Sequence, residues 1–168
     1  MPCEIERKFL VVGDYKSLAA SASAVAQGYI CAERGRTVRV RIRGERGYLT
    51  IKGPSLDGGL SRYEWEKELP LSEARELMQL CGPGAIEKTR WLVPWEGHTF
   101  EVDEFHGANE GLVIAEVELA RPDEAFARPP FLGRELTGDV RFYNTSLGQR
   151  PYTAWPEAER AELVSAGR

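Results

Sequence analysis

Polar and hydrophobic residues alternate along much of the chain, which is the pattern of β-strands that have two different faces. The clearest stretch is TVRVRIR at residues 37–43, in which three aliphatic side chains share one face and three arginines share the other. Turn-forming residues follow at 44–47, and YLTIK at 48–52 alternates again, so this region is predicted to form a β-hairpin. The same alternation predicts strands at residues 4–9, 63–69, 87–93, 99–105 and 113–119.

Signals for helices and for strand ends are fewer. The Gly-Pro pair at 53–54 is expected to stop the second strand of the hairpin, and Asp-Gly-Gly at 57–59 to form a flexible loop. Helices are predicted at residues 73–81 with Ser72 as the cap, in part of 14–26, at 123–127 after Pro122, and at 156–166. The mixed order, with mostly adjacent antiparallel strands, indicates a β-rich α+β fold in one domain.

Six of the predicted strands carry at least two charges on one face, as with Glu64 and Glu66 or Glu116 and Glu118. For any single strand the ordinary interpretation is a half-buried sheet whose charged face meets solvent. The opposite faces carry large apolar residues such as Trp65, which suit a sheet packed on helices from outside. A closed barrel with a wet, polar lumen accommodates both faces at once.

Such a lumen would hold both signs of charge. Its acids would be Glu4, Glu6, Glu64, Glu66, Glu101, Asp103, Glu116 and Glu118, and its bases Lys8, Arg39, Arg41, Arg43, Lys52, Lys88 and Arg90. Confined charges must be paired or bind ions. Carboxylates without His or Cys favour Mg²⁺ or Mn²⁺, and Arg and Lys suit phosphate. With no glycine-rich phosphate loop, these side chains predict a site for a metal–polyphosphate ligand.

Composition narrows the class of protein. The 168 residues contain 22 Lys+Arg and 26 Asp+Glu, so the net charge of −4 argues against a nucleic-acid partner. Three unpaired-looking cysteines are expected to be reduced thiols in a cytoplasmic protein. Charges from Glu4 onward and the lack of an 18-residue apolar run disfavour a secreted or membrane protein.

Eight segments follow one another in an order that resembles the CYTH superfamily, the triphosphate tunnel metalloenzymes. They are EIERK, VRVRI, LTIKG, YEWEKEL, IEKTRW, FEVDEF, AEVEL and GDVRFYN. The resemblance covers residues 3–147 of a single domain, with 148–168 as a C-terminal tail that is helical in part. It implies a closed eight-stranded antiparallel tunnel barrel with flanking helices, and is nearest to the small bacterial branch of inorganic triphosphatases.

The resemblance also implies roles for individual residues. Triphosphate would be bound by Lys8, Arg39, Arg41, Lys52, Lys88 and Arg90, and Mg²⁺ or Mn²⁺ by Glu4, Glu6, Glu64, Glu66, Asp103, Glu116 and Glu118. Lys8, Tyr29 and Lys52 would take part in catalysis. Three placements stay open: Tyr29 in the site or in the core, Arg43 in the lumen or at its mouth, and Arg141 over the site or paired with a surface acid.

The implied activity is metal-dependent hydrolysis of tripolyphosphate to pyrophosphate and phosphate. Thiamine triphosphatase and adenylate cyclase (class IV type) activities on the same fold are the enzymatic alternatives, because all three share the grip on a triphosphate. The non-enzymatic alternatives are a polyphosphate-binding module, or an RNA-binding module that uses residues 37–46. Eight carboxylates near the basic strand would repel a nucleic acid. The sequence leaves the oligomeric state open.

Overall fold

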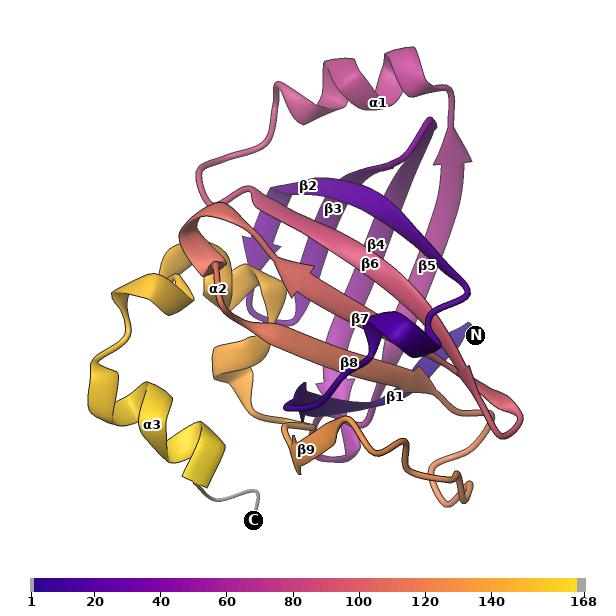
Figure 1. Cartoon of the computed structure of the whole chain (residues 1–168). Coiled ribbons are helices and arrows are strands. Elements are labelled where there is room, and N and C mark those ends of the chain that lie inside the picture. Colours follow the sequence, from indigo (N-terminus) through magenta and orange to yellow (C-terminus); the bar gives the residue numbers. More distant parts are fainter. Residues whose placement is uncertain (1, 166–168) are drawn as a thin grey trace.

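The computed structural model describes residues 2–165 and is dominated by a closed antiparallel barrel (Figure 1). Its eight strands are β1 (Cys3–Val11), β2 (Ser21–Glu33), β3 (Arg36–Arg43), β4 (Arg46–Leu56), β5 (Ser61–Leu69), β6 (Ile86–Trp95), β7 (His98–Phe105) and β8 (Val113–Glu118). Around the ring they follow the order β5-β4-β3-β2-β6-β7-β8-β1, and β1 closes the ring onto β5. The predicted β-rich α+β fold with a closed eight-stranded barrel is confirmed.

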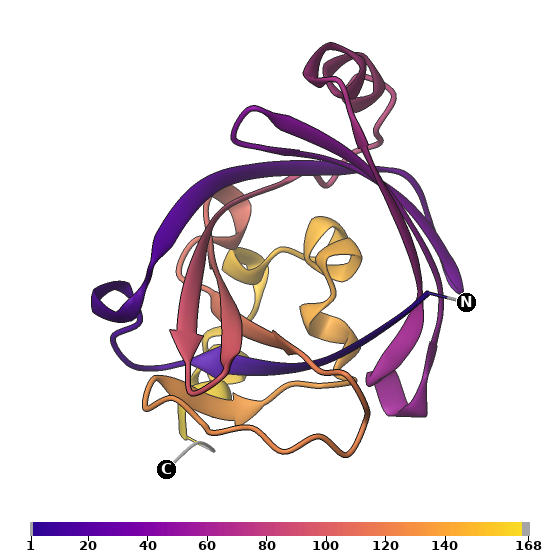
Figure 2. The same ribbon diagram turned by 90° about the vertical axis from the view of Figure 1, so that its right-hand side faces the viewer.

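The strand order decides which walls of the barrel face each other. Strand β3 lies four strands away from β8 in either direction, and β2 lies four strands away from β1. These pairs of strands are therefore on opposite sides of the lumen, and Figure 2 shows β1 and β2 on opposite sides of the ring. A short ninth strand, β9 (Leu132–Glu135), pairs with the end of β1.

The outer face of β1, β6, β7 and β8 forms one hydrophobic core. Phe9, Phe100 and Val117 are fully buried there. The cover comes from Tyr15 and from the loop around Phe126, whose ring meets Phe100 edge-on. Helices were expected to cover this face, but irregular segments cover it instead.

Helix α1 (Leu71–Met78) packs on the outside of β3 and β4. Its close approach requires Gly47, because a Cβ atom there would lie 2.3 Å from the Cβ of Ala74. The helix predicted at 73–81 is thus present, but it starts after Pro70, so Ser72 lies in its first turn and is not its cap.

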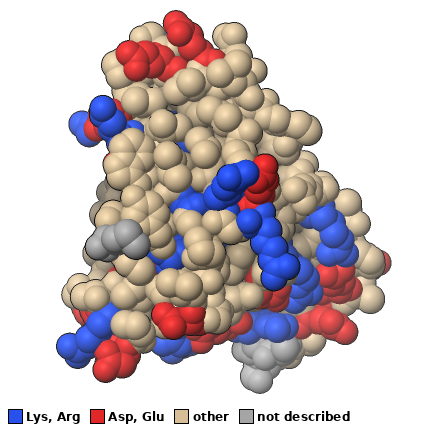
Figure 3. All heavy atoms as spheres, turned by 180° about the vertical axis from the view of Figure 1, so that it is seen from behind, with Lys and Arg blue, Asp and Glu red and all other residues tan. Residues whose placement is uncertain are grey.

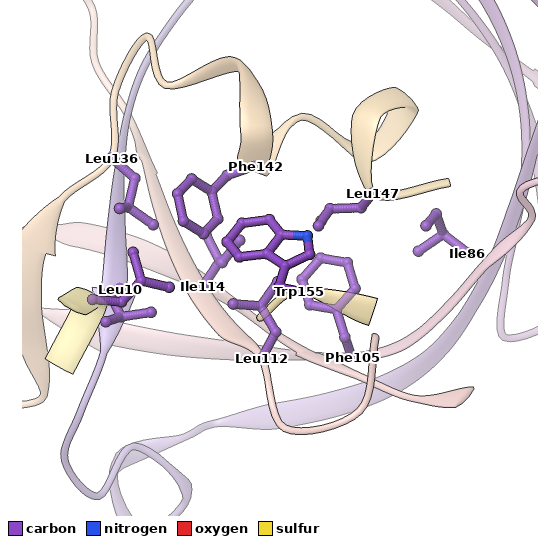
Figure 4. Packing of buried hydrophobic residues seen from close by; sticks show 10 residues of the cluster. Leu10, Ile86, Phe105, Leu112, Ile114, Leu136, Phe142, Leu147 and Trp155 are labelled. Atoms are coloured by element: carbon purple, nitrogen blue, oxygen red, sulfur yellow. The ribbon is translucent and has the colours of Figure 1, made fainter. Parts of the chain in front are cut away.

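The C-terminal plug, our name for residues 140–165, closes one end of the barrel. It contains α2 (Asn144–Gln149), α3 (Glu157–Ser165) and two single turns of 3-10 helix, Val140–Phe142 and Tyr152–Ala154. Its buried side chains, among them Phe142, Leu147, Trp155 and Leu163, pack on the inward-facing Leu10, Ile86, Phe105 and Ile114 (Figure 4). The lumen therefore has an apolar end and a charged remainder.

Three expectations about local structure are wrong, and a fourth holds only in part. The helix expected in part of residues 14–26 is only one 3-10 turn, Lys16–Leu18, and residues 21–26 belong to strand β2. The pair at 53–54 does not end β4, which runs on to Leu56 through an irregularity in its pairing with β5. The loop predicted at 57–59 is a single 3-10 turn. The helix predicted at 123–127 is absent, because Phe126 and the Glu124 side chain, which accepts from the Ala120 N–H, hold the segment against the barrel. The helix predicted at 156–166 is α3, and residue 166 lies outside the described part of the chain.

Within residues 2–165 no helix has the length and apolar character needed to cross a membrane. Cys3, Cys31 and Cys81 are all free thiols.

Candidate functional site

Inward-facing side chains of the barrel enclose a cavity of about 220 Å³. The predicted residues that line it are Glu4, Glu6, Lys8, Tyr29, Arg39, Arg41, Arg43, Lys52, Glu64, Glu66, Arg90, Glu101, Glu116 and Glu118. Tyr29 therefore faces the lumen and is not a core residue, and Arg43 also lines the lumen. Lys88 and Asp103 are absent from this lining and are described below.

The neighbouring strands β1 and β8 form the acidic wall, our name for Glu4, Glu6, Glu116 and Glu118. Burial and the carboxylates of Glu116 and Glu4 raise the pKa of Glu6 well above its ordinary value of 4.5. Burial and the charges of Glu4 and Glu101 also raise the pKa of Glu118. Negative charge is in excess at this wall, so a cation placed there would be stabilised.

Two lysines lie among these carboxylates. The Nζ of Lys52 is 2.7 Å from an oxygen of Glu4 and 2.7 Å from an oxygen of Glu64. The Nζ of Lys8 is 3.4 Å from Glu116. Burial alone would raise the pKa of Glu4, but the charge and the hydrogen bond of Lys52 act against this effect, and the pKa is lowered overall. Acids and bases are interleaved in the lumen and partly neutralise each other.

The acidic wall has the donor chemistry of a site for a hard divalent cation, because all its donors are carboxylate oxygens. Among residues 2–165, no three side chains of His, Cys, Asp or Glu are close enough to form a ready-made metal site. Lys52 occupies the space between Glu4 and Glu64. The donors and their excess charge fit a cation such as Mg²⁺, and binding it requires some of these side chains to move.

Strand β3 forms the basic wall, our name for Arg39, Arg41 and Arg43, across the lumen from β8. Arg39 contacts Glu66 at 3.6 Å and Thr50 at 3.2 Å, and its buried Nε has no hydrogen-bond partner within the described chain. Burial and the charges of Arg39 and Arg90 lower the pKa of Arg41 to about 9. Buried guanidinium groups with open donors are suited to bidentate contacts with phosphate oxygens.

A buried ion cluster supports the cavity at its apolar end. Asp103 accepts hydrogen bonds from Nε and Nη2 of Arg90, each at 2.8 Å, and from Lys88 at 2.6 Å. Lys88 is 1% exposed and its Nζ lies 5.5 Å from the ring centre of Phe105. Lys88 and Asp103 thus lie behind Arg90. They are connected to the cavity through Arg90, which lines it and is bound to Asp103.

Several lining residues were missed by the sequence analysis, namely Thr37, Arg62, Tyr143, Asn144 and Thr145. Arg62 lies two residues before Glu64 on β5 and therefore on the same face of the strand, so the alternation pattern could have identified it. Tyr143 lies in the plug, beneath both Lys8 and Arg62, whose charges are 5.4 Å and 5.8 Å from its ring centre. Its placement depends on long-range packing, for which the sequence pattern holds no signal.

Arg141 does not reach over the site. It binds Asp139 at 2.7 Å and Glu159 at 3.2 Å, both within the C-terminal part of the chain. Its contacts hold the plug together.

A second cavity, of about 690 Å³, adjoins the lumen between the β2–β3 hairpin and the plug. Thr37, Arg62, Tyr143 and Thr145 line both cavities. We call this second cavity the vestibule. The charged lumen is therefore continuous with a roomier and less charged space.

Comparisons with known proteins agree with this architecture. A family model described as CYTH domain matches residues 3–152. The inorganic triphosphatase of Acetivibrio thermocellus is 49% identical over 156 residues, which is 92% of this chain and 98% of the relative. That of Nitrosomonas europaea is 35% identical over 149 residues, 86% of this chain and 95% of the relative.

Among solved structures, the crystal structure of the inorganic triphosphatase NE1496 is similar, with a TM-score of 0.62 and 32% identity. The match covers 86% of this chain and 97% of that one. With a tunnel barrel, opposed acidic and basic walls, and a family match over nearly its whole length, this chain belongs to the CYTH domain family.

Proposed function

We propose that this protein hydrolyses inorganic triphosphate to pyrophosphate and phosphate in the barrel lumen, with a divalent metal ion. The observation that carries the proposal is the pairing of an acidic wall with a basic wall around one cavity of about 220 Å³. A ligand that satisfies both walls must itself contain anionic and cationic parts, as a metal-bound triphosphate does. Both curated relatives named above are inorganic triphosphatases.

The basic side chains are assigned to the triphosphate. Arg39, Arg41 and Arg90 present guanidinium groups to the cavity, and Lys8 and Lys52 present ammonium groups. Lys88 adds positive charge from behind Arg90. Lys8 and Lys52 are proposed to stabilise the negative charge that develops on the transferred phosphoryl group, because both ammonium groups face the same cavity.

The acidic wall, with Glu64 opposite Lys52, would hold the metal ion. We propose Mg²⁺ or Mn²⁺, which would neutralise phosphate oxygens and lower the pKa of a bound water. Asp103 is left out of this ligand set, because both of its oxygens are held by Arg90 and Lys88. Glu66 is a further candidate ligand, because the Thr50 hydroxyl, at 2.7 Å, donates to only one of its two oxygens.

Proton transfer needs an acceptor oxygen in the same cavity. The carboxylates of the acidic wall are the strongest acceptors there, and Glu6 holds a proton most readily of them, since burial and the neighbouring carboxylates raise its pKa. Tyr29 faces the cavity from β2, on the side opposite β1. We assign it to hydrogen bonding with the triphosphate.

The test is phosphate release from tripolyphosphate by the wild type and by Lys8→Met and Glu6→Gln variants. We expect each variant to lose about 100-fold or more in kcat, as when a preorganised charge at a reacting centre is removed. The wild type is expected to lose its activity in EDTA. Lys67→Met is the matched control, because Lys67 is exposed on the outer face of β5. Turnover at the wild-type rate in both lumen variants would contradict the proposal.

The vestibule favours a second candidate, an organic triphosphate whose organic group sits outside the lumen. At about 690 Å³ it has room for a nucleoside or thiamine group, and Tyr143 and Thr145 connect it to the charged cavity. Assays of ATP, GTP and thiamine triphosphate beside tripolyphosphate, with cyclic AMP measured separately, decide between the candidates. Higher kcat/KM for any of the organic triphosphates would reverse our ranking.

A further inference from the structure

The cations of the lumen differ in the kind of partner that holds them. Most are paired with carboxylates: Lys8 with Glu116, Lys52 with Glu4 and Glu64, Arg39 with Glu66, and Arg90 with Glu101 and Asp103. Arg41 and Arg43 are held instead by neutral side chains of β2, Gln27 and Ser23. In the part of the chain that the structure describes, no carboxylate forms an ion pair with Arg41.

Gln27 is a neutral residue that accepts two hydrogen bonds from the guanidinium group of Arg41. The two lie directly opposite each other in the pairing of β2 with β3. The Oε1 of Gln27 accepts from Nε of Arg41 at 3.0 Å and from Nη2 at 2.9 Å. Gln27 itself is fully buried. This is the place that the carboxylate of an ion pair would take, but the residue there is an uncharged amide.

The amide has a second contact. Its Nε2 donates to the hydroxyl oxygen of Tyr29 at 3.3 Å. The phenolic oxygen is thereby used as an acceptor, which leaves its own O–H free to donate. One buried side chain thus orients two groups that line the cavity, a guanidinium and a phenol.

A buried charge is normally paired within the protein, because an unpaired one is costly to desolvate. Gln27 satisfies two of the five N–H donors of Arg41 and cancels none of its charge. The missing counter-charge is then supplied from outside, and the phosphate oxygens of a bound triphosphate are suited to supply it.

We propose that Gln27 is a positioning residue that fixes Arg41 and Tyr29 with a neutral amide, so that the full charge of Arg41 is kept for a phosphate group. The inference rests on the proposed function, and it assigns substrate affinity to a residue that does not itself touch the substrate. Replacing the amide by a carboxylate of the same shape would cancel this charge.

The test compares Gln27→Glu with Gln27→Met, using steady-state kinetics on tripolyphosphate and thermal unfolding. Gln27→Glu gives Arg41 an ion-pair partner, so we expect it to unfold no earlier than the wild type. Its KM should nevertheless rise about tenfold or more, because the triphosphate must compete with a buried carboxylate. Gln27→Met leaves Arg41 without an acceptor, so its unfolding temperature should fall, with a smaller rise in KM.

In our account Gln27→Glu has the higher KM although Gln27→Met is the less stable protein. If the role of Gln27 were purely structural, the less stable Gln27→Met would also be the less active variant. Gln79→Glu adds the same charge on the exposed end of α1 and serves as the control. A Gln27→Glu protein with wild-type KM, or one that fails to fold, would overturn the inference.

Wild-type turnover in the same assay reports on the proposed function separately. If the wild type does not hydrolyse tripolyphosphate, calorimetric titration of tripolyphosphate into the wild type and Gln27→Glu still decides the inference. Equal affinities of the two proteins would contradict it, and weaker binding by Gln27→Glu would support it.

Discussion

The ammonium group of Lys52 lies between the carboxylates of Glu4 and Glu64, 2.7 Å from each. Lys52 is buried, and both carboxylates are mostly shielded from solvent. Each partner therefore depends on the other two, because an isolated charge at this depth would be poorly solvated. The position between the two acids is also one that a metal ion could take.

Lys52→Met tests this arrangement. Without the ammonium, the two carboxylates repel each other, and we expect the free energy of unfolding to fall by about 1–3 kcal/mol. Added Mg²⁺ or Mn²⁺ should then raise the unfolding temperature more in Lys52→Met than in the wild type, because an ion can replace the lost charge. Thermal unfolding with and without metal measures both effects.

Lys67→Met controls for the loss of one positive charge, since Lys67 points outward from the same strand as Glu64. If metal ions stabilise Lys52→Met no more than they stabilise this control, the acids beside Lys52 are not metal donors.

At the scale of single residues, the sequence pattern predicted the positions of charged side chains in the lumen but not those of neutral ones. The alternation of TVRVRIR and of the acidic strands placed nearly all the charged lining residues on the correct face. Gln27 and Thr50 escaped notice because neutral side chains on an alternating strand carry no signal of their own. Lys88 and Asp103 lie on the same strand faces as Arg90 and Glu101, but they do not line the cavity: Asp103 is bound to Arg90, and the Lys88 ammonium lies over the ring of Phe105.

The C-terminal plug is the element on which the lumen depends most. Trp155 is 2% exposed, its ring meets Phe142 edge-on, and its indole N–H donates to the Arg150 carbonyl at 3.1 Å. The residues of the plug that line the cavity, such as Tyr143, are held in place by this packing. Loss of the packing should therefore reach the site.

We expect Trp155→Ala to lower the free energy of unfolding by about 3–5 kcal/mol, the usual cost of a large cavity in a core. Urea denaturation measures the loss. Val164→Ala on the exposed side of α3 should cost about 0.5 kcal/mol or less. If Trp155→Ala is as stable as Val164→Ala, the plug is not part of the cooperative fold.

At the scale of elements, alternation was a good guide where the two faces differ and a poor one elsewhere. Strand β2 begins SASAVA, and small residues on both faces conceal its period. The alanines favour a helix locally, but pairing with both β3 and β6 overrides that preference. The plug is defined by contacts between residues far apart in the chain, such as the hydrogen bond from the Tyr152 N–H to Asn109, and no local pattern encodes them.

The whole molecule keeps much of its charge inside. The net charge of −4 is small, yet the lumen contains more than a dozen lining residues that are acidic or basic. On the face shown in Figure 3, basic side chains with acidic neighbours lie near the middle of the view, and other charged residues are intermingled with uncharged ones toward its lower part. The charges that the proposed reaction would use are therefore in the interior of the barrel.

The central claim is that this interior converts tripolyphosphate to pyrophosphate and phosphate with the help of a divalent cation. Phosphorus-31 NMR of tripolyphosphate incubated with the wild-type protein tests it most directly. With Mg²⁺ or Mn²⁺, we predict that the tripolyphosphate resonances are replaced by those of pyrophosphate and phosphate in equal amounts, and that EDTA prevents the change. Tripolyphosphate that stays intact with both metals would contradict the account.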